Sequence, residues 1–411
     1  MAQLWNKNEP IIRSLLETDV YKILMLNYIF RYYPNLQATF SFINRTDTDL
    51  LRYVDVDELR EQLAHVASLR FTEGDIAYLQ SWGMFRTNFP KELRQVKLEM
   101  PSVDVVDGKL RIDAGGLWSH STLWEIPTLA IVSELYGRGR AKAEGISEQQ
   151  LFAAAMARLE LKADFFNQNP GLKASQFALR RRISGLWERF MTEYLRDHTS
   201  VLTGVSNVEL ARELDMEAQG TNAHELPMAA YAEARGSSNF AARASVYQVL
   251  HDWQMIYGQK ALIMLPDAYG TDPFLEKLPD DYIYDWRGFR QDSGDAVEFG
   301  EKIIKLYERY GIDPMEKVVI FSDGLNPERM KSLYEHFTGR INVAFGVGTN
   351  LSNDTGLIKP LSLVMKLSEV NGRPTVKLSD NIAKATGDPA EIEVAKRIFG
   401  YTTTFKEAAV Y

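Results

Sequence analysis

The sequence predicts an α/β protein, with a parallel barrel or open sheet in the second half of the chain and an α+β region in the first third. From about residue 200, short apolar or β-branched runs each lead into a polar, glycine-rich loop and then into a helix; these runs are 201–203, 261–265, 318–321 and 342–345. Nearly all the unusual polar residues lie in the loops after the runs. Because loops at the carboxyl ends of parallel strands meet on one side, we expect one active face there.

The first third of the chain mixes strand and hairpin signals with helical ones. Residues 37–43 alternate loosely between apolar and polar side chains. Residues 96–100 and 103–106 precede an Asp107-Gly108 pair, which is typical of a hairpin turn. These signals predict the α+β region.

Helix ends are well marked at four places. Ser147 and Gln150 have the spacing of a capping box, so a helix is predicted from Ser147 to about residue 166. Asn326 followed by a proline is typical of a helix start, and Gly311 and Gly339 lie where left-handed C-terminal caps belong.

Strand character returns after residue 353. Residues 364–370 and 375–378 flank an Asn371-Gly372 pair and predict an antiparallel hairpin, which would let the tail pack back onto the first third of the chain. From these changes of pattern we expect two domains, one formed by 1–125 with 356–411 and the other by 126–355.

Composition excludes several classes of protein. Of 411 residues, 45% are apolar and 25% are charged, which excludes intrinsic disorder, collagen-like repeats and a disulfide-stapled miniprotein. The net charge of −8 would repel a phosphate backbone, so we expect no nucleic-acid partner. The chain has no cysteine, which removes disulfides, thiolate nucleophiles and sulfur-ligated zinc. The start of the chain has no signal-peptide core and no apolar stretch approaches the ~18 residues that cross a bilayer, so we expect a cytoplasmic protein with no membrane partner.

Two neighbouring loops have the composition of a phosphate site. Gly346 and Gly348 follow a predicted strand and allow backbone amides to approach an anion, while Thr349 adds a hydroxyl. Asp323 and Gly324 occupy the same place one strand–helix unit earlier, so both loops could meet one ligand. A plain tight turn is the alternative for the first loop, and a Rossmann site is disfavoured because the third glycine of its fingerprint is absent.

The segment 288–295 carries an arginine and two carboxylates within six residues, before a helix. Arg290 is a candidate anion ligand. Asp292 and Asp295 are candidates for a ribose diol or for a Mg²⁺ that carries pyrophosphate, because hard cations prefer carboxylate oxygens. The alternative is ordinary helix-start chemistry, with Asp292 as the cap and Asp295 favourable to the helix dipole.

Three consecutive arginines, 180–182, stand out in an acidic chain. On a helix they would point in three directions, and a solvated charged face is the usual fate of such a run. One guanidinium that points inward would suit a carboxylate or phosphate, and Arg180 is the candidate.

His224 is the candidate catalytic histidine. It lies in a short polar segment, 220–225, after a predicted helix, and Glu225 follows it with a carboxylate that could orient the ring. Four of the other histidines lie in sequences that look helical and need no special role.

Together and in this order, these segments resemble the nicotinate phosphoribosyltransferase family, in the type II phosphoribosyltransferase group. The resemblance spans nearly the whole chain and rests on residues 15–22, 124–127, 180–182, 204–207 and 220–225 and on the loops at 292, 323 and 346. It implies an irregular, TIM-like α/β barrel plus an α+β domain formed by both chain ends. It also implies a homodimer with active sites at the subunit interface.

The same resemblance implies an activity. Nicotinate and 5-phosphoribosyl 1-pyrophosphate would give nicotinate mononucleotide and pyrophosphate in NAD salvage. ATP as co-substrate would phosphorylate His224, and hydrolysis of that phosphohistidine would drive the reaction. Mg²⁺ held by Asp292 or Asp295 would help pyrophosphate to leave.

The resemblance also assigns the remaining binding roles. The pyridine ring would stack between Phe177 of one subunit and Tyr21 of the other, and Arg180 with Ser206 would address its carboxylate. Arg290 would hold ligand phosphate or carboxylate. Gly346, Gly348 and Thr349 would cradle the ribose 5-phosphate. Many relatives have a glycine where this chain has Ala178, which makes base preference the least secure of these expectations.

Three other interpretations remain open at this level. The same fold could act on nicotinamide or quinolinate, although arginines near the base favour an acid over a neutral amide. The chain could be a binding protein that keeps nucleotide and phosphate sites without turnover. An unrelated sugar-phosphate barrel such as an aldolase would be expected to carry a Schiff-base lysine or a histidine–carboxylate metal cluster at strand ends. Lys260 and Lys317 precede their strands, which is the wrong end.

Overall fold

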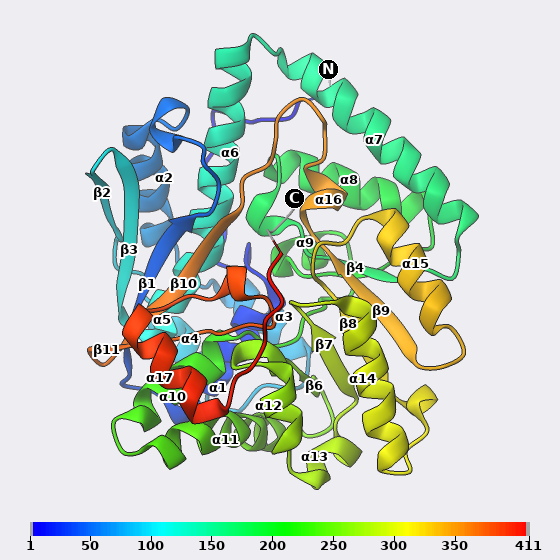
Figure 1. Ribbon diagram of the computed structural model, residues 1–411. Coiled ribbons are helices and arrows are strands. Elements are labelled where there is room, and N and C mark those ends of the chain that lie inside the picture. The colour runs from blue at the N-terminus through cyan, green and yellow to red at the C-terminus, as the bar shows by residue number, and fades with distance from the viewer. Residues whose placement is uncertain (1–2, 408–411) are drawn as a thin grey trace.

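The computed structural model describes residues 3–407, and within them the strands form two separate sheets (Figure 1). One sheet is antiparallel, with the order β11-β10-β1-β3-β2, and the other is parallel, with the order β5-β4-β9-β8-β7-β6. The antiparallel strands are β1 Gln37–Asn44, β2 Ser102–Val106, β3 Lys109–Leu117, β10 Leu363–Val370 and β11 Arg373–Pro374. The parallel strands are β4 Ala174–Gln176, β5 Leu202–Val205, β6 Ile263–Met264, β7 Gly288–Gln291, β8 Val318–Phe321 and β9 Asn342–Val347.

Helices connect and cover both sheets. The α-helices are α1 Val20–Tyr32, α2 Val56–Ser68, α3 Glu73–Ser81, α4 Phe89–Gln95, α5 Trp118–Ser121, α6 Glu125–Glu144, α7 Glu148–Gln168, α8 Gly185–His198, α9 Val208–Glu213, α10 Glu225–Arg235, α11 Asn239–Tyr257, α12 Thr271–Glu276, α13 Asp280–Asp285, α14 Ala296–Arg309, α15 Pro327–Phe337, α16 Thr349–Ser352 and α17 Pro389–Phe399. The 3₁₀ turns are η1 Leu50–Arg52, η2 Thr122–Trp124, η3 Leu179–Arg181, η4 Pro266–Ala268, η5 Pro314–Glu316 and η6 Ile382–Lys384. No helix among residues 3–407 is long and apolar enough to span a membrane.

The antiparallel sheet joins the two ends of the chain. Strand β1 lies between β3 and β10 and pairs antiparallel with both, and Figure 1 shows blue β1 beside orange β10. The β2–β3 hairpin turns at Asp107 and Gly108, which both have positive φ. The first arm and the turn of the hairpin predicted after residue 353 are present, but the strand that pairs with β10 is β11, and no strand forms over the expected second arm at 375–378. The expected strand at 96–100 does not form. The domain boundaries at 125 and 355 stay a prediction.

The parallel sheet confirms the predicted α/β architecture. Residues 318–321 and 342–345 fall within β8 and β9, and the runs at 201–203 and 261–265 overlap β5 and β6. The pairings run from β5 at one edge to β6 at the other, and no ladder joins these two strands in the described part of the chain. The closed, TIM-like barrel therefore stays a prediction.

Four predicted helix ends are confirmed. The Ser147 hydroxyl and the Gln150 side chain form a reciprocal capping box at the start of α7. The Asn326 side chain accepts a hydrogen bond from the Arg329 amide at the start of α15. Gly311 and Gly339 have φ values of 67° and 75°, in the left-handed region that glycine tolerates. These caps fix where the loops of the parallel sheet begin and end.

Candidate active site

Two adjoining pockets lie where the carboxyl ends of the parallel strands meet the antiparallel sheet. The cationic pocket has a free volume of about 130 Å³, and the histidine pocket one of about 60 Å³. The cationic pocket is lined by Arg45, Phe177, Arg180, Arg181, Arg290, Asp292, Ser322, Asp323, Gly324, Leu325, Gly346, Gly348, Thr349, Asn350, Val364, Lys366, Lys377 and Lys384. The histidine pocket is lined by Tyr21, Phe40, Glu125, Arg180, Ala223, His224, Glu225, Met228, Leu265, Arg290, Asp292, Met365, Lys366 and Leu367. The four shared residues, Arg180, Arg290, Asp292 and Lys366, make the two pockets one site.

The structure brings most of the predicted site residues together. Twelve of the fourteen line one pocket or the other, and the two that do not are Ser206 and Asp295. The Asp295 side chain caps α14 by accepting a hydrogen bond from the Glu298 amide at 2.8 Å. The helix-start alternative is therefore correct for Asp295, whereas Asp292 lines the pocket.

Two glycines, Gly346 at the end of β9 and Gly348 just after it, leave room for the residue that follows β4. A Cβ on Gly346 would lie 2.4 Å from the Phe177 ring, and one on Gly348 would lie 2.9 Å from the Phe177 carbonyl oxygen. The Phe177 amide donates to the Val347 carbonyl at 2.7 Å. The two glycines therefore let residue 177 pack against this loop, beside Thr349 in the cationic pocket.

Arg290, Asp292 and Ser322 form a connected polar group at the ends of β7 and β8. An Arg290 Nη2 donates to Asp292 Oδ1 at 2.7 Å, and Arg290 Nε donates to the Ser322 hydroxyl at 2.8 Å. Burial raises the pKa of Asp292, but Arg290, His224 and two lysines hold it well below its usual range. Asp292 is thus an ionised carboxylate on the shared wall of the two pockets.

His224 immediately precedes α10, and the carboxylate beside its ring is Asp267. His224 Nε2 lies 2.5 Å from Asp267 Oδ1, while Nδ1 lies 3.8 Å from Asp292 Oδ2. Burial lowers the pKa of His224, and Asp267 opposes that shift. His224 and Lys377 hold the pKa of Asp267 below its usual range against the burial that raises it. The group is therefore a neutral imidazole that donates from Nε2 to an ionised carboxylate, with the Nδ1 lone pair directed away from Asp267.

The structure corrects the expected role of Glu225. Its carboxylate bonds to Lys22 Nζ at 2.6 Å, to the Trp118 indole nitrogen at 2.5 Å and to the Thr122 hydroxyl at 2.6 Å. Consecutive side chains at a helix start diverge by about 100°, so Glu225 cannot share the direction of His224. Glu225 anchors α10 to α1 and η2 rather than orienting the imidazole.

Asp267 could have been predicted from its position. It lies in η4, directly after β6, which is where Asp292 and Asp323 lie relative to β7 and β8. The proline before it and the apolar residues after it gave no polar cluster to mark it. A search for carboxylates after every predicted parallel strand would have included it.

The arginine run does point in three directions. Arg180 lies 3.5 Å from Asp19 and 3.4 Å from Glu125 and lines both pockets, whereas Arg181 donates to Thr349 at 3.4 Å. Arg182 is the inward one, buried between Glu17 at 3.0 Å and Glu188 at 2.8 Å. Arg180 therefore keeps a guanidinium at the site, and Arg182 has a structural role.

The two aromatic residues expected at the base site line different pockets of this chain. Tyr21 lines the histidine pocket and its hydroxyl donates to Glu125 at 3.1 Å, while Phe177 lines the cationic pocket next to Arg180. Stacking of the pyridine ring between Phe177 of one subunit and Tyr21 of the other stays a prediction. Ser206 is buried behind them, where its hydroxyl donates to Asp19. The homodimer stays a prediction.

The sequence reasoning missed four cations that line the cationic pocket. Lys366 lies on β10, Lys377 and Lys384 follow it along the chain, and Arg45 follows β1. Lys384 donates to Asp323 Oδ1 at 2.5 Å and opposes the burial that raises the pKa of Asp323. Burial lowers the pKa of Lys366 to about 7. These side chains come from the antiparallel sheet and the segment after it, which have no strand–loop–helix pattern to mark an active face.

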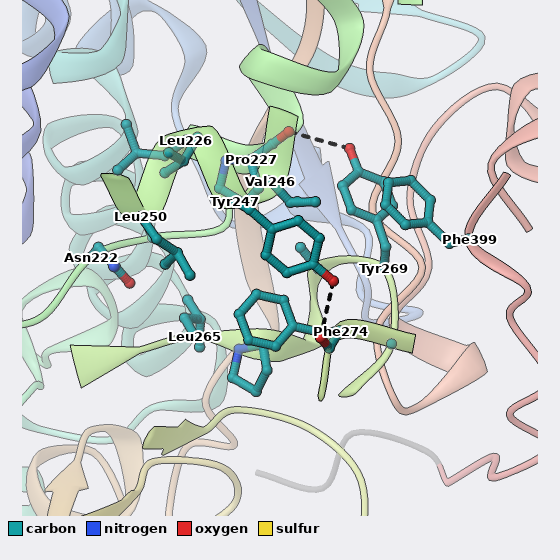
Figure 2. A pocket seen from close by; sticks show the side chains of 15 residues that line it. Asn222, Leu226, Pro227, Val246, Tyr247, Leu250, Leu265, Tyr269, Phe274 and Phe399 are labelled. Atoms are coloured by element: carbon teal, nitrogen blue, oxygen red, sulfur yellow. Dashed lines mark hydrogen bonds between the residues drawn. The ribbon is translucent and has the colours of Figure 1, made fainter. Parts of the chain in front are cut away.

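A third cavity lies behind the segment that carries His224 (Figure 2). Its lining residues include no charged side chain, and its free volume is about 30 Å³. The Tyr247 hydroxyl donates to the Phe274 carbonyl and the Tyr269 hydroxyl to the Pro227 carbonyl, as the dashed lines show. This apolar packing supports residues 222–227 and 265–270 from behind, and the charged chemistry lies in the other two pockets.

Two models of one protein family match most of the chain. The model of the nicotinate phosphoribosyltransferase family matches residues 172–403, and the model of that family's N-terminal domain matches residues 16–133. The structure is similar to that of nicotinate phosphoribosyltransferase from Porphyromonas gingivalis, with a TM-score of 0.84 and 31% identity over 95% of this chain and 100% of the other. For nicotinate phosphoribosyltransferase from Vibrio cholerae the TM-score is 0.86, with 32% identity over 96% of this chain and 95% of the other. For a putative nicotinate phosphoribosyltransferase from Saccharomyces cerevisiae the TM-score is 0.83, with 30% identity over 97% of this chain and 100% of the other.

Proposed function

Because the chain belongs to the nicotinate phosphoribosyltransferase family, we propose that it makes nicotinate mononucleotide and pyrophosphate from nicotinate and 5-phosphoribosyl 1-pyrophosphate, and that ATP drives this reaction through a phosphohistidine at His224. The observation that carries the ATP-driven step is the buried His224–Asp267 pair, which lies beside a cation-lined pocket. A neutral imidazole in this setting is a competent phosphoryl acceptor near pH 7.

The hydrogen bond at Nε2 selects the atom that reacts. Nε2 donates to Asp267, so the Nδ1 lone pair attacks the γ-phosphorus of ATP, the bond to the β,γ-bridging oxygen breaks and ADP leaves. The imidazolium that forms keeps its Nε2 proton and is stabilised by the Asp267 carboxylate. The product is therefore Nδ1-phosphohistidine.

The cationic pocket suits the phosphates of both substrates. Arg45, Arg290, Lys366, Lys377 and Lys384 supply positive charge around the loops of β7 to β9. They would hold the 5-phosphate and stabilise the departing pyrophosphate as the bond to the ribose carbon breaks.

Asp292 is the carboxylate that fits a Mg²⁺ ion carried by a phosphate ligand. Mg²⁺ needs only one or two carboxylates when substrate phosphates complete its coordination, and Asp292 with Asp323 lines the cationic pocket. No group of three or more histidine or acidic side chains that could hold a metal occurs among residues 3–407, which is compatible with a metal that arrives with its substrate. A Mg²⁺ ion bound there would neutralise part of the negative charge on the phosphates. The proposal gives this role to Asp292 rather than to Asp295, because the Asp295 side chain caps α14.

Arg180 favours an acidic base over a neutral amide. Its guanidinium lies between Asp19 and Glu125 at the wall that both pockets share, and an incoming pyridine carboxylate would complete its contacts. Tyr21 and Phe177 supply aromatic surface for the pyridine ring on the same side of the site.

The phosphohistidine is tested by incubating the purified protein with Mg²⁺ and ATP labelled at the γ-phosphate. We expect acid-labile, base-stable label on the wild-type chain and none on His224→Ala. His251→Ala, which removes an exposed histidine on α11, is the matched control and should label like wild type. Label that persists in His224→Ala would overturn this part of the proposal.

A further inference from the structure

The two oxygens of the Asp267 carboxylate have different partners. Oδ1 lies 2.5 Å from His224 Nε2, and Oδ2 accepts a hydrogen bond from the Ser293 hydroxyl at 2.6 Å. Asp267 and Ser293 are each 1% exposed, so bulk water does not replace either contact. The Lys377 ammonium also lies near Oδ2, with Nζ at 3.4 Å.

A backbone amide fixes the direction of the Ser293 hydrogen bond. The Asp380 amide donates to Ser293 Oγ at 3.0 Å, so the hydroxyl proton is directed to Asp267. The resulting chain of donors runs from Asp380 through Ser293 to Asp267, and His224 donates to the other carboxylate oxygen. Aligned hydrogen bonds of this kind polarise one another in a buried setting.

The segment that carries Ser293 is itself held in place. The Gln291 side-chain amide donates to the Ser293 carbonyl at 3.1 Å and to the Gly294 carbonyl at 3.0 Å. Gly294 has a φ of 77°, and a Cβ there would lie 3.0 Å from Asp380 Cβ. The turn and the segment at Asp380 therefore pack tightly enough to set the position of the hydroxyl.

From this geometry we propose that Ser293 is a positioning residue, which holds the Asp267 carboxylate so that His224 keeps its proton on Nε2 and presents Nδ1 to the phosphoryl donor. The proposal rests on the function proposed above for His224. Without the hydroxyl, Asp267 Oδ2 keeps only Lys377 nearby, and rotation of the carboxylate toward that lysine would draw Oδ1 away from the imidazole. The ring would then populate the tautomer with its proton on Nδ1. In that tautomer Nδ1 has no lone pair with which to attack phosphorus.

The first measurement is the histidine tautomer, read from the ¹⁵N shifts of ¹⁵N-histidine-labelled protein in the absence of ATP. We expect His224 to carry its proton on Nε2 in the wild type and to show a mixture of tautomers in Ser293→Ala. Ser245→Ala is the matched control, because it removes another buried hydroxyl whose hydrogen bond, to the Ala242 carbonyl, lies within α11. A wild-type tautomer in Ser293→Ala would overturn the inference.

The second measurement is the rate at which γ-labelled ATP labels His224. We expect this rate to fall about tenfold or more in Ser293→Ala, the usual effect of losing a hydrogen bond to a charged group, and to stay at the wild-type value in Ser245→Ala. Equal rates in wild type and Ser293→Ala would also overturn the inference. If wild type itself takes no label, the proposed phosphohistidine fails, and the tautomer measurement still decides the role of Ser293.

Discussion

At the scale of single residues, Arg180 determines how the site receives an acidic base. Burial opposes its charge, but Tyr21, Asp19 and Glu125 raise the pKa of its guanidinium above the ordinary value, and Glu125 in turn has a pKa lowered to about 2. Arg180→Ala should raise the KM for nicotinate about tenfold or more, because a charge-assisted hydrogen bond is lost, and should change the KM for phosphoribosyl pyrophosphate much less. Steady-state kinetics with each substrate varied in turn checks this. Arg196→Ala, on the exposed face of α8, is the control, and equal effects on both substrates would remove Arg180 from the carboxylate site.

Lys366 gives the site a pH dependence of its own. Burial lowers its pKa to about 7, with Glu125 opposing that shift, so the side chain is charged below pH 7 and loses its charge as pH rises through 7. We expect kcat/KM for phosphoribosyl pyrophosphate to fall as pH rises from 6.5 to 8.5, because kcat/KM reports the titration of the free enzyme. Lys366→Arg stays charged throughout and should flatten this limb of the pH profile. An unchanged limb in that variant would assign the titration to another group.

Single residues also show the limit of reasoning from sequence. His224, Asp292, Arg290 and Arg180 stood in unusual polar segments and could be found. Asp267 was missed because one carboxylate after a short apolar run has no polar neighbours that mark it, and only its position after a parallel strand could have indicated it. Its role depends on a contact with a residue 43 positions away, which no local pattern encodes.

At the scale of elements, the end of β9 and the residue that follows β4 act as one unit. Gly346→Ala would place a methyl group 2.4 Å from the Phe177 ring, so the ring or the loop must move. We expect the KM values for nicotinate and phosphoribosyl pyrophosphate to rise together, since Phe177 and the loop line the same pocket. Gly137→Ala in α6 is the control, because its Cβ would meet nothing within 4 Å. Wild-type kinetics in Gly346→Ala would contradict the close packing of the two elements.

The elements that sequence reasoning missed are those with weak local signals. Strand β4 is three residues long with two polar side chains, and β7 contains a glycine, an arginine and a glutamine, so neither has an apolar run. Both lie inside the parallel sheet, where pairing on two sides stabilises them regardless of propensity. Helix α15 and the capping box of α7 could be predicted because their signals lie within a few residues of each other.

At the scale of the whole molecule, Lys22 links segments that are distant in the chain. It is fully buried on α1 and bonds to Glu225 at 2.6 Å, to Glu125 at 2.8 Å and to the Thr122 hydroxyl at 2.9 Å. Lys22→Met would remove the cation that two buried carboxylates share, although Glu125 keeps Arg180 at 3.4 Å, and we expect the free energy of unfolding to fall by about 3–5 kcal/mol. Urea denaturation measures this, with the exposed Lys331→Met as control. A loss below about 1 kcal/mol, the usual limit for a surface pair, would contradict the anchoring role.

The site as a whole draws on both sheets. The parallel sheet presents Asp267, Arg290, Asp292 and Asp323 from its loops, and β10 with the segment after it adds Lys366, Lys377 and Lys384. The pairing of β10 with β1 places those lysines over the loops, although they lie far from those loops in the sequence. The sequence therefore predicted the carboxylate side of the site, while the lysine side depends on how the chain ends pair.

The central claim is that this chain joins nicotinate to phosphoribosyl pyrophosphate and that ATP drives the reaction. The most direct measurement is chromatography of the products formed by purified protein with Mg²⁺ and phosphoribosyl pyrophosphate, when nicotinate, nicotinamide or quinolinate is offered with and without ATP. We expect nicotinate mononucleotide from nicotinate alone, in an amount that rises with ATP. A mononucleotide formed from another base in preference, or a yield from nicotinate that does not respond to ATP, would contradict this account.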